Sequence, residues 1–208
     1  MTRASGLYAV ILAAGDSTRM GTDKALLPWP PVAPGSSPTG QTFLSAAIRA
    51  LVPFSEKVIV VAGRNETAIA PVVYANGASL ASNPEPDRGQ FSSLQVGLQQ
   101  VLNDGRDAAM VTLVDRPPVK ADTLKALCSA FTEAPSSVWA VVPEYNGKHG
   151  HPFLLAREMI EAFLKAPSGA NAQDVEHQNL QHIAYVAVDD PLVTFNVDTP
   201  EQYAALSR

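Results

Sequence analysis

The 208-residue chain has one cysteine, no excess of positive charge and no long apolar run, and each of these shortages excludes a class of protein. A single cysteine, Cys128, rules out an internal disulfide framework. The net charge of -5 argues against a general nucleic-acid or membrane-surface binder, because such proteins present a basic face. No stretch approaches the roughly 20 apolar residues that span a bilayer. We therefore expect neither nucleic acid nor a membrane as a partner.

The chain does have a large apolar fraction. Hydrophobic residues make up 46% and charged residues 17%, which predicts a globular protein with a sizeable core. At this length we expect one domain over residues 1–208. The apolar run from Leu7 to Ala14 is short and passes into Gly15-Asp16 without a typical cleavage site. We interpret it as a core strand rather than a signal peptide, and we expect a cytoplasmic protein.

Strand-like and helix-like runs alternate along the chain. Such alternation predicts an α/β fold, a three-layer α/β/α sandwich with a mostly parallel sheet. The expected strands are Leu7–Leu12, Lys57–Val61, Ala78–Ser82, Ala108–Val114, Val138–Val142 and Ile183–Val188. The expected helices are Phe43–Leu51, Ser92–Leu102, Ala121–Phe131 and Ala156–Leu164, with a weaker one after Thr67. The Pro-rich stretch from Pro28 to Gly40 is interpreted as an extended surface loop.

The first strand runs directly into a loop, Leu12-Ala-Ala-Gly-Asp-Ser-Thr-Arg-Met-Gly21, which is followed by Lys24. Small residues and glycines let the backbone approach a ligand, and the N–H groups of such a loop can cradle phosphate oxygens. Arg19 can bind a phosphate bidentately, and Lys24 can neutralise one as a point charge. The loop is neither a Walker A nor a G-x-G-x-x-G sequence. We still favour a nucleoside triphosphate as its ligand over a plain turn with two solvated cations.

Two carboxylates far apart in the sequence are candidate metal ligands. Asp115 ends an apolar strand in Thr112-Leu-Val-Asp-Arg-Pro-Pro118, and ligands of open α/β sheets bind beyond the carboxyl ends of strands. Asp198 precedes Thr199, which can cap a helix that has Pro200 at its first position. Each Asp alone is compatible with a simple turn. Together they predict a magnesium (Mg²⁺) site, because Mg²⁺ is usually held by one or two carboxylates and substrate phosphates.

Two further segments carry polar groups. Asp87-Arg-Gly-Gln-Phe-Ser-Ser-Leu94 precedes a helical run, and Ser92 or Ser93 can either cap that helix or contact a base or ribose. Tyr145-Asn-Gly-Lys-His-Gly-His151-Pro contains two histidines but no nearby cysteine, which disfavours zinc. We interpret this second segment as a loop over the pocket of an acceptor substrate.

In this order, these features resemble the molybdenum cofactor nucleotidyltransferases, a branch of the glycosyltransferase-A type NTP transferases. The opening loop and Lys24 match that family's Leu-Ala-Ala/Gly-Gly-x-Ser-x-Arg-Met-Gly signature. Asp115-Arg-Pro117 resembles its Asp-x-Pro, Gly150-His-Pro152 its Gly-His-Pro loop, and Asp198-Thr-Pro-Glu-Gln-Tyr203 its late Asp-Thr-Pro-Glu-x-Tyr. The resemblance covers nearly the whole chain.

The resemblance implies transfer of a nucleoside monophosphate from an NTP to a phosphorylated acceptor, with molybdopterin as the best-known acceptor and a molybdenum enzyme as a possible partner. It implies catalytic roles for Arg19 and Lys24 and metal binding by Asp115 and Asp198. The residues implied to bind the nucleotide or acceptor are Leu12, Ala13, Ala14, Gly15, Ser17, Met20, Gly21, Gln90, Ser92, Ser93 and His151. The family's cytidylyltransferases carry Leu-Ala-Ala-Gly, so Ala14 favours CTP over GTP.

Three departures from the family pattern leave alternatives open. Val114 stands where the family usually has Gly, no Arg follows Gly169, and the loop from Pro28 to Gly40 is long. The same opening loop suits sugar-phosphate and alditol-phosphate nucleotidyltransferases, although these usually carry longer chains. A non-catalytic chaperone that hands cofactor to a molybdenum enzyme is a third reading.

Overall fold

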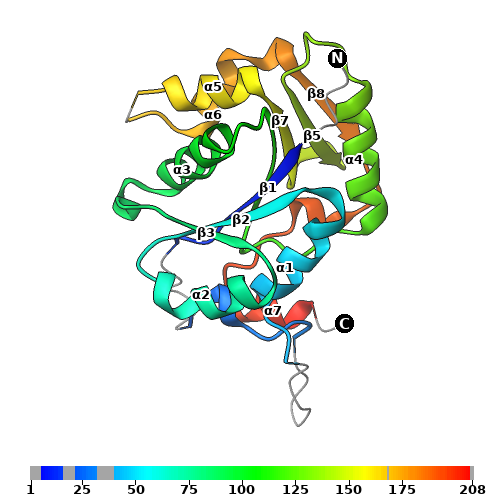
Figure 1. Ribbon diagram of the computed structural model, residues 1–208. Coiled ribbons are helices and arrows are strands. Elements are labelled where there is room, and N and C mark those ends of the chain that lie inside the picture. The colour runs from blue at the N-terminus through cyan, green and yellow to red at the C-terminus, as the bar shows by residue number, and fades with distance from the viewer. Residues whose placement is uncertain (1–5, 16–21, 32–39, 168, 207–208) are drawn as a thin grey trace.

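The computed structural model describes residues 6–15, 22–31, 40–167 and 169–206. Within these ranges the chain forms one eight-stranded mixed sheet with helices on both faces (Figure 1). The predicted three-layer α/β/α architecture is therefore confirmed. No helix in the described part of the chain is long and apolar enough to cross a membrane.

The first half of the sheet is parallel and has β1 (Leu7–Leu12) at its centre. Strand β1 pairs on one side with β2 (Lys57–Ala62), which pairs with β3 (Ser79–Ser82), and on the other side with β4 (Ala108–Leu113). Leu12 is level with both Val61 and Leu113. The carboxyl ends of β1 and β4 therefore open onto the same edge of the sheet.

The second half of the sheet contains an antiparallel strand that we did not expect. Strand β7 (Phe153–Ala156) lies antiparallel between β4 and β5 (Ala140–Tyr145). Strand β5 pairs further with the short β6 (Lys148–His149) and with β8 (Ile183–Ala187). All four side chains of β7 are buried, so its sequence shows none of the alternation that identifies a half-exposed strand.

Helices cover the two faces because side chains of β1 alternate between two cores. Ala9 and Ile11 pack in one core beneath α1 (Phe43–Leu51), α2 (Glu66–Ala75) and α4 (Ala121–Glu133). Tyr8, Val10 and Leu12 pack in the other core. The helices over that second core are α3 (Gln90–Asn103), α5 (Arg157–Lys165) and α6 (Ala172–Gln178).

Two capping expectations had different outcomes. The prediction that Ser92 or Ser93 caps a helix is wrong, because α3 begins earlier, at Gln90, with Gly89 at its N-cap. The Thr199 cap is confirmed: its hydroxyl accepts from the Gln202 amide, and Pro200 opens α7 (Pro200–Ala205).

Candidate active site

The two predicted metal ligands meet at the carboxyl edge of the sheet. The backbone just before Asp115 continues the β1–β4 pairing, since the Val114 amide donates to the Leu12 carbonyl at 3.0 Å. The Val197 amide then donates to the Asp115 carbonyl at 2.9 Å, which docks the late segment onto this edge. The N-terminus of α7 fixes Asp198 further, because the Asp198 amide donates to Gln202 Oε1 at 2.6 Å. Backbone contacts thus bring two distant carboxylates together.

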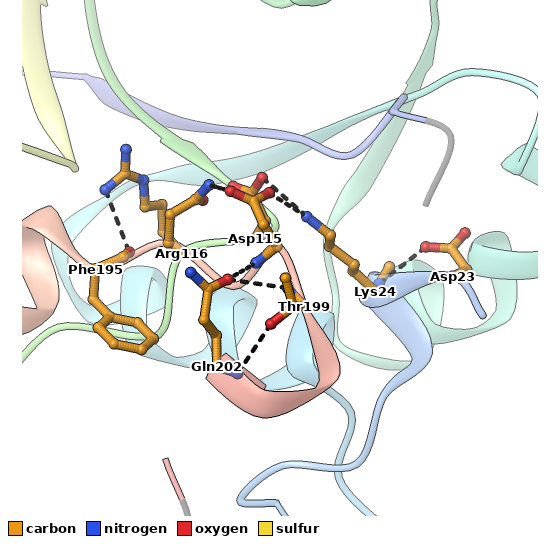
Figure 2. Close-up of polar contacts among 10 residues, drawn as sticks. Asp23, Lys24, Asp115, Arg116, Phe195, Thr199 and Gln202 are labelled. Carbon is orange, nitrogen blue, oxygen red and sulfur yellow. Dashed lines mark hydrogen bonds and ion pairs between the residues drawn. The ribbon is translucent and has the colours of Figure 1, made fainter. Parts of the chain in front are cut away.

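Lys24 joins the two carboxylates. Its Nζ lies 3.0 Å from Asp198 Oδ1 and 3.5 Å from Asp115 Oδ2 (Figure 2). The lysine begins a short 3-10 helix, Lys24–Leu26, whose N-cap is Asp23. Its side chain is only 13% exposed, so the ammonium group neutralises the pair in a partly dry environment. The sequence pointed to four charged residues for the site. Three of them, Lys24, Asp115 and Asp198, lie together in the described part of the chain.

Asn65 holds the beginning of the opening loop and its end near one another. Its Nδ2 donates to the Ala13 carbonyl at 2.9 Å and to Asp23 Oδ2 at 2.7 Å. Ala13 is also tied to the sheet, because its amide donates to the Val61 carbonyl at 2.8 Å. We had not singled out Asn65, which follows β2 in a stretch without any recognisable motif. Asn65 therefore helps to place Lys24 beside the sheet.

The electrostatics at Asp115 suit a cation. Burial raises the pKa of its carboxyl above the ordinary value, the Asp198 charge raises it further, and Lys24 and Arg116 oppose both effects. Its Oδ1 is buried and finds no hydrogen-bond partner among the described residues. An unpartnered carboxylate oxygen beside a second carboxylate is the hard-oxygen donor set that Mg²⁺ and similar cations prefer. The residues present therefore fit a divalent cation.

A cavity of about 360 Å³ lies over these charges, and we refer to it as the smaller cavity. Its lining includes Leu12, Ala14, Gly15, Lys24, Gln90, Ser93, Asp115 and Asp198. Val114, the residue that departs from the family's Gly, also lines it. Ala13 is buried beside this cavity. Ser17, Arg19, Met20 and Gly21 lie outside the described residues.

Ser92 does not border the smaller cavity. Its hydroxyl donates to the Gly89 carbonyl at 2.7 Å and accepts from Asn83 Nδ2 at 2.8 Å. Asn83 also donates to Ser93 Oγ at 2.9 Å. The arrangement gives Ser92 a structural position inside the first turn of α3, whereas Ser93 reaches the cavity.

A larger cavity of about 730 Å³ adjoins the smaller one, because Leu12, Gly89, Gln90 and Leu113 line both. His149, Gly150 and His151 border the larger cavity. The His149 ring stacks on Tyr185 with centroids 3.9 Å apart and planes within 12°. This ring pair was not foreseen, since the two residues come from different strands and share no motif.

His151 is held as a neutral ring. Its amide donates to the Val193 carbonyl at 2.8 Å, and its Nδ1 is buried without a partner among the described residues. Burial, with the nearby Arg116 charge, lowers the pKa of His151 from 6.5 to about 3. The ring is therefore uncharged near neutral pH.

Comparison with known proteins places the chain in a family. The model of the MobA-like NTP transferase domain matches residues 9–184. A probable molybdenum cofactor guanylyltransferase of Rhodopirellula baltica is 33% identical over 132 residues, which are 64% of this chain and 59% of that protein's length. The molybdenum cofactor cytidylyltransferase of Escherichia coli K12 is 23% identical over 205 residues, covering 96% of this chain and 94% of that protein.

The solved structures agree on the fold. The crystal structure of Rv0371c from Mycobacterium tuberculosis is 26% identical, with a TM-score of 0.79 over 99% of this chain and 98% of that one. A manganese complex of Rv0371c superposes with a TM-score of 0.75 at 23% identity, over 97% of this chain and 98% of that one. The family match covers most of the chain, including most of β1 and the strand end that carries Asp115. The chain therefore belongs to the MobA-like NTP transferase family, within the nucleotidyltransferases.

Proposed function

We propose that this protein transfers a nucleoside monophosphate from an NTP, with CTP favoured over GTP, to a phosphorylated acceptor of the molybdopterin class. The observation that carries the proposal is the meeting of Lys24, Asp115 and Asp198 in a smaller cavity that adjoins a larger one. The smaller cavity would hold the nucleotide and the larger one the acceptor. The names of the two molybdenum cofactor transferases among the relatives support this acceptor class.

The proposed reaction is a displacement at phosphorus. An oxygen of the acceptor's phosphate attacks the α-phosphorus of the NTP, and a new P–O bond forms. The bond from the α-phosphorus to the bridging oxygen breaks, and its electron pair leaves with pyrophosphate. Such reactions depend chiefly on positioning and charge stabilisation. Lys24 would exchange its carboxylate partners for phosphate oxygens, and Arg19 would add a second positive charge.

Asp115 and Asp198 would hold the metal, for which we propose Mg²⁺. Their oxygens fit a hard cation, and the manganese complex of Rv0371c is consistent with metal binding in this fold. A bound divalent ion would neutralise charge on the triphosphate and on the departing pyrophosphate, an effect worth several kcal/mol. The two carboxylates would hold the ion in the smaller cavity.

Ala14 is the residue that we propose favours CTP. Its side chain lines the smaller cavity and packs close to Gly63, where an added Cβ would lie 3.1 Å from the Ala14 methyl group. A methyl group there restricts the space for a purine base. We therefore expect Ala14→Gly to raise kcat/KM for GTP relative to CTP. Ala170→Gly, at a residue that lines the larger cavity but not the smaller one, should leave that ratio unchanged.

The stacked rings of His149 and Tyr185 favour a flat acceptor. They present an aromatic wall in the larger cavity, next to the loop that carries His151. Offset stacking on aromatic side chains suits a planar heterocycle such as a pterin. A molybdenum enzyme would be the natural recipient of the nucleotide-bearing product.

The test is pyrophosphate release by the purified protein with CTP, Mg²⁺ and molybdopterin. We expect release that requires all three components and is slower with GTP. Equal or faster release with a sugar phosphate or an alditol phosphate would replace the proposed acceptor. Binding of CTP and molybdopterin without any release of pyrophosphate would instead identify a cofactor-handling chaperone.

A further inference from the structure

The guanidinium of Arg116 lies at the border of the larger cavity and has hydrogen-bond donors to spare. It directly follows Asp115, and its half-buried side chain lines that cavity together with His151. Its Nη1 donates to the Phe195 carbonyl at 3.3 Å (Figure 2). Its Nε is buried and finds no acceptor among the described residues. A guanidinium has five N–H donors, so this one retains most of its capacity to bind an anion.

The charges around Arg116 leave room for an added anion. Asp115 and Asp198 act on its guanidinium from the side of the smaller cavity. On the side of the larger cavity its neighbour is His151, a neutral ring that carries no compensating negative charge. Burial lowers the pKa of Arg116, but an arginine remains protonated in proteins. A fixed positive charge is therefore partly withdrawn from water without a full set of partners.

We propose that Arg116 binds the phosphate group of the acceptor and holds it beside the two metal-binding carboxylates, an inference that rests on the proposed function. A phosphate monoester would supply the acceptor oxygens that the guanidinium lacks, in the bidentate geometry that arginine forms with phosphate. The residue follows Asp115 directly, so the attacking phosphate would arrive at the junction of the two cavities. Arg116 would thus define the acceptor as a phosphorylated molecule.

A purely structural role makes different predictions. Arg116 bonds to Phe195, three residues before Asp198, so it could serve only to dock the late segment. Loss of such a dock would displace Asp198 and weaken nucleotide binding. Loss of a phosphate ligand would weaken acceptor binding alone. The experiment must therefore measure the two ligands separately.

The test compares Arg116→Gln and Arg116→Lys with a matched control, Arg157→Gln. Arg157 lines neither the larger nor the smaller cavity, and its exposed side chain pairs with Glu161 at 2.9 Å. With the smaller cavity filled by α,β-methylene-CTP and Mg²⁺, calorimetry measures binding of phenyl phosphate. We expect Arg116→Gln to weaken phenyl phosphate binding roughly ten- to hundredfold. Arg116→Lys should weaken it less, and Arg157→Gln should match the wild type.

Binding of the CTP analogue decides between the two roles. We expect it to stay within about twofold of wild type in both Arg116 variants, and the KM for molybdopterin to rise while the KM for CTP does not. Wild-type phenyl phosphate binding by Arg116→Gln, or equal losses of both ligands in both variants, would overturn the inference. If the wild type binds phenyl phosphate through Arg116 yet does not use molybdopterin, the inference stands and only the proposed acceptor fails.

Discussion

Most of the proposed chemistry depends on single residues at the edge of β1 and β4, and above all on Asp115. One of its oxygens is buried without a partner among the described residues, and the other lies 3.5 Å from Lys24 Nζ. Such a carboxylate is costly to bury unless a cation uses it. The burial of Asp115 therefore favours the proposed role as a metal ligand over the role of a simple turn residue.

We expect Asp115→Asn and Lys24→Ala each to lower turnover roughly a hundredfold or more, because each removes a charge that stabilises the triphosphate. Pyrophosphate release at saturating CTP and Mg²⁺ measures the effect. Asp122→Asn is the control, since Asp122 is exposed on α4 and pairs with Lys125 at 3.1 Å. Near-normal turnover in both site variants, with the control also active, would remove Asp115 and Lys24 from the mechanism.

The neutral ring of His151 makes stability depend on pH. The unfolded histidine takes up a proton near pH 6.5, whereas the folded one does so only near pH 3. The unfolded state thus binds more protons between these values, and the free energy of unfolding falls as the pH is lowered through this window. The contribution is about 1.4 kcal/mol per pH unit at most.

Urea unfolding of His151→Gln between pH 7 and 4.5 checks this expectation. The variant should lose stability less steeply than the wild type as the pH falls. Gln178→Ala, which changes an exposed residue of α6 that carries no titratable group, should keep the wild-type slope. Parallel pH profiles for His151→Gln and the wild type would show that the ring is protonated as easily in the folded state as in the unfolded one.

At the scale of elements, α3 is positioned by a close approach to the sheet. A Cβ added at Gly97 would lie 2.5 Å from Val10 Cγ1 and 3.0 Å from Val61 Cγ2. Gly97 therefore lets α3 lie directly on β1 and β2. The same helix presents Gln90 and Ser93 to the smaller cavity. The fit between helix and sheet consequently fixes one wall of the site.

We expect Gly97→Ala to lower the free energy of unfolding by about 1–3 kcal/mol, because the methyl group overpacks this contact. Denaturant unfolding measures the change. Gln99→Ala, on the exposed side of the same helix, should have little effect. A Gly97→Ala variant as stable as the wild type would mean that α3 can move away from the sheet without cost.

Elements with a clear apolar period were predictable from the sequence, whereas elements without such a period were missed. Helix α1 has the expected bounds, Phe43–Leu51, because an apolar stripe and the Thr42–Ser45 capping box define both. Strand β7 was missed because four buried apolar residues give no period. Helix α6 was also missed, although Asn171 and Asp174 form a capping box at its start; it spans seven residues with one buried side chain, Val175, and so shows no apolar period.

Across the whole molecule, the division of the cleft into two cavities could not have been read from the sequence. The motifs identified residues from both cavities, including Lys24, Asp115 and His151. They did not identify the His149–Tyr185 ring pair or the hydrogen bonds of Asn65 to Ala13 and Asp23. These contacts depend on how segments after separate strands come together. Charged motifs at strand ends can therefore be predicted from the sequence, but the shape of the larger cavity cannot.

The most direct test is a crystal structure of the protein with CTP and Mn²⁺, in which anomalous scattering locates the metal. We expect one anomalous peak within coordination distance of carboxylate oxygens of both Asp115 and Asp198. We also expect the triphosphate in the smaller cavity beside Lys24. An ordered nucleotide elsewhere, or a metal that contacts neither carboxylate, would contradict the proposal that the two carboxylates and Lys24 bind one metal-bound triphosphate.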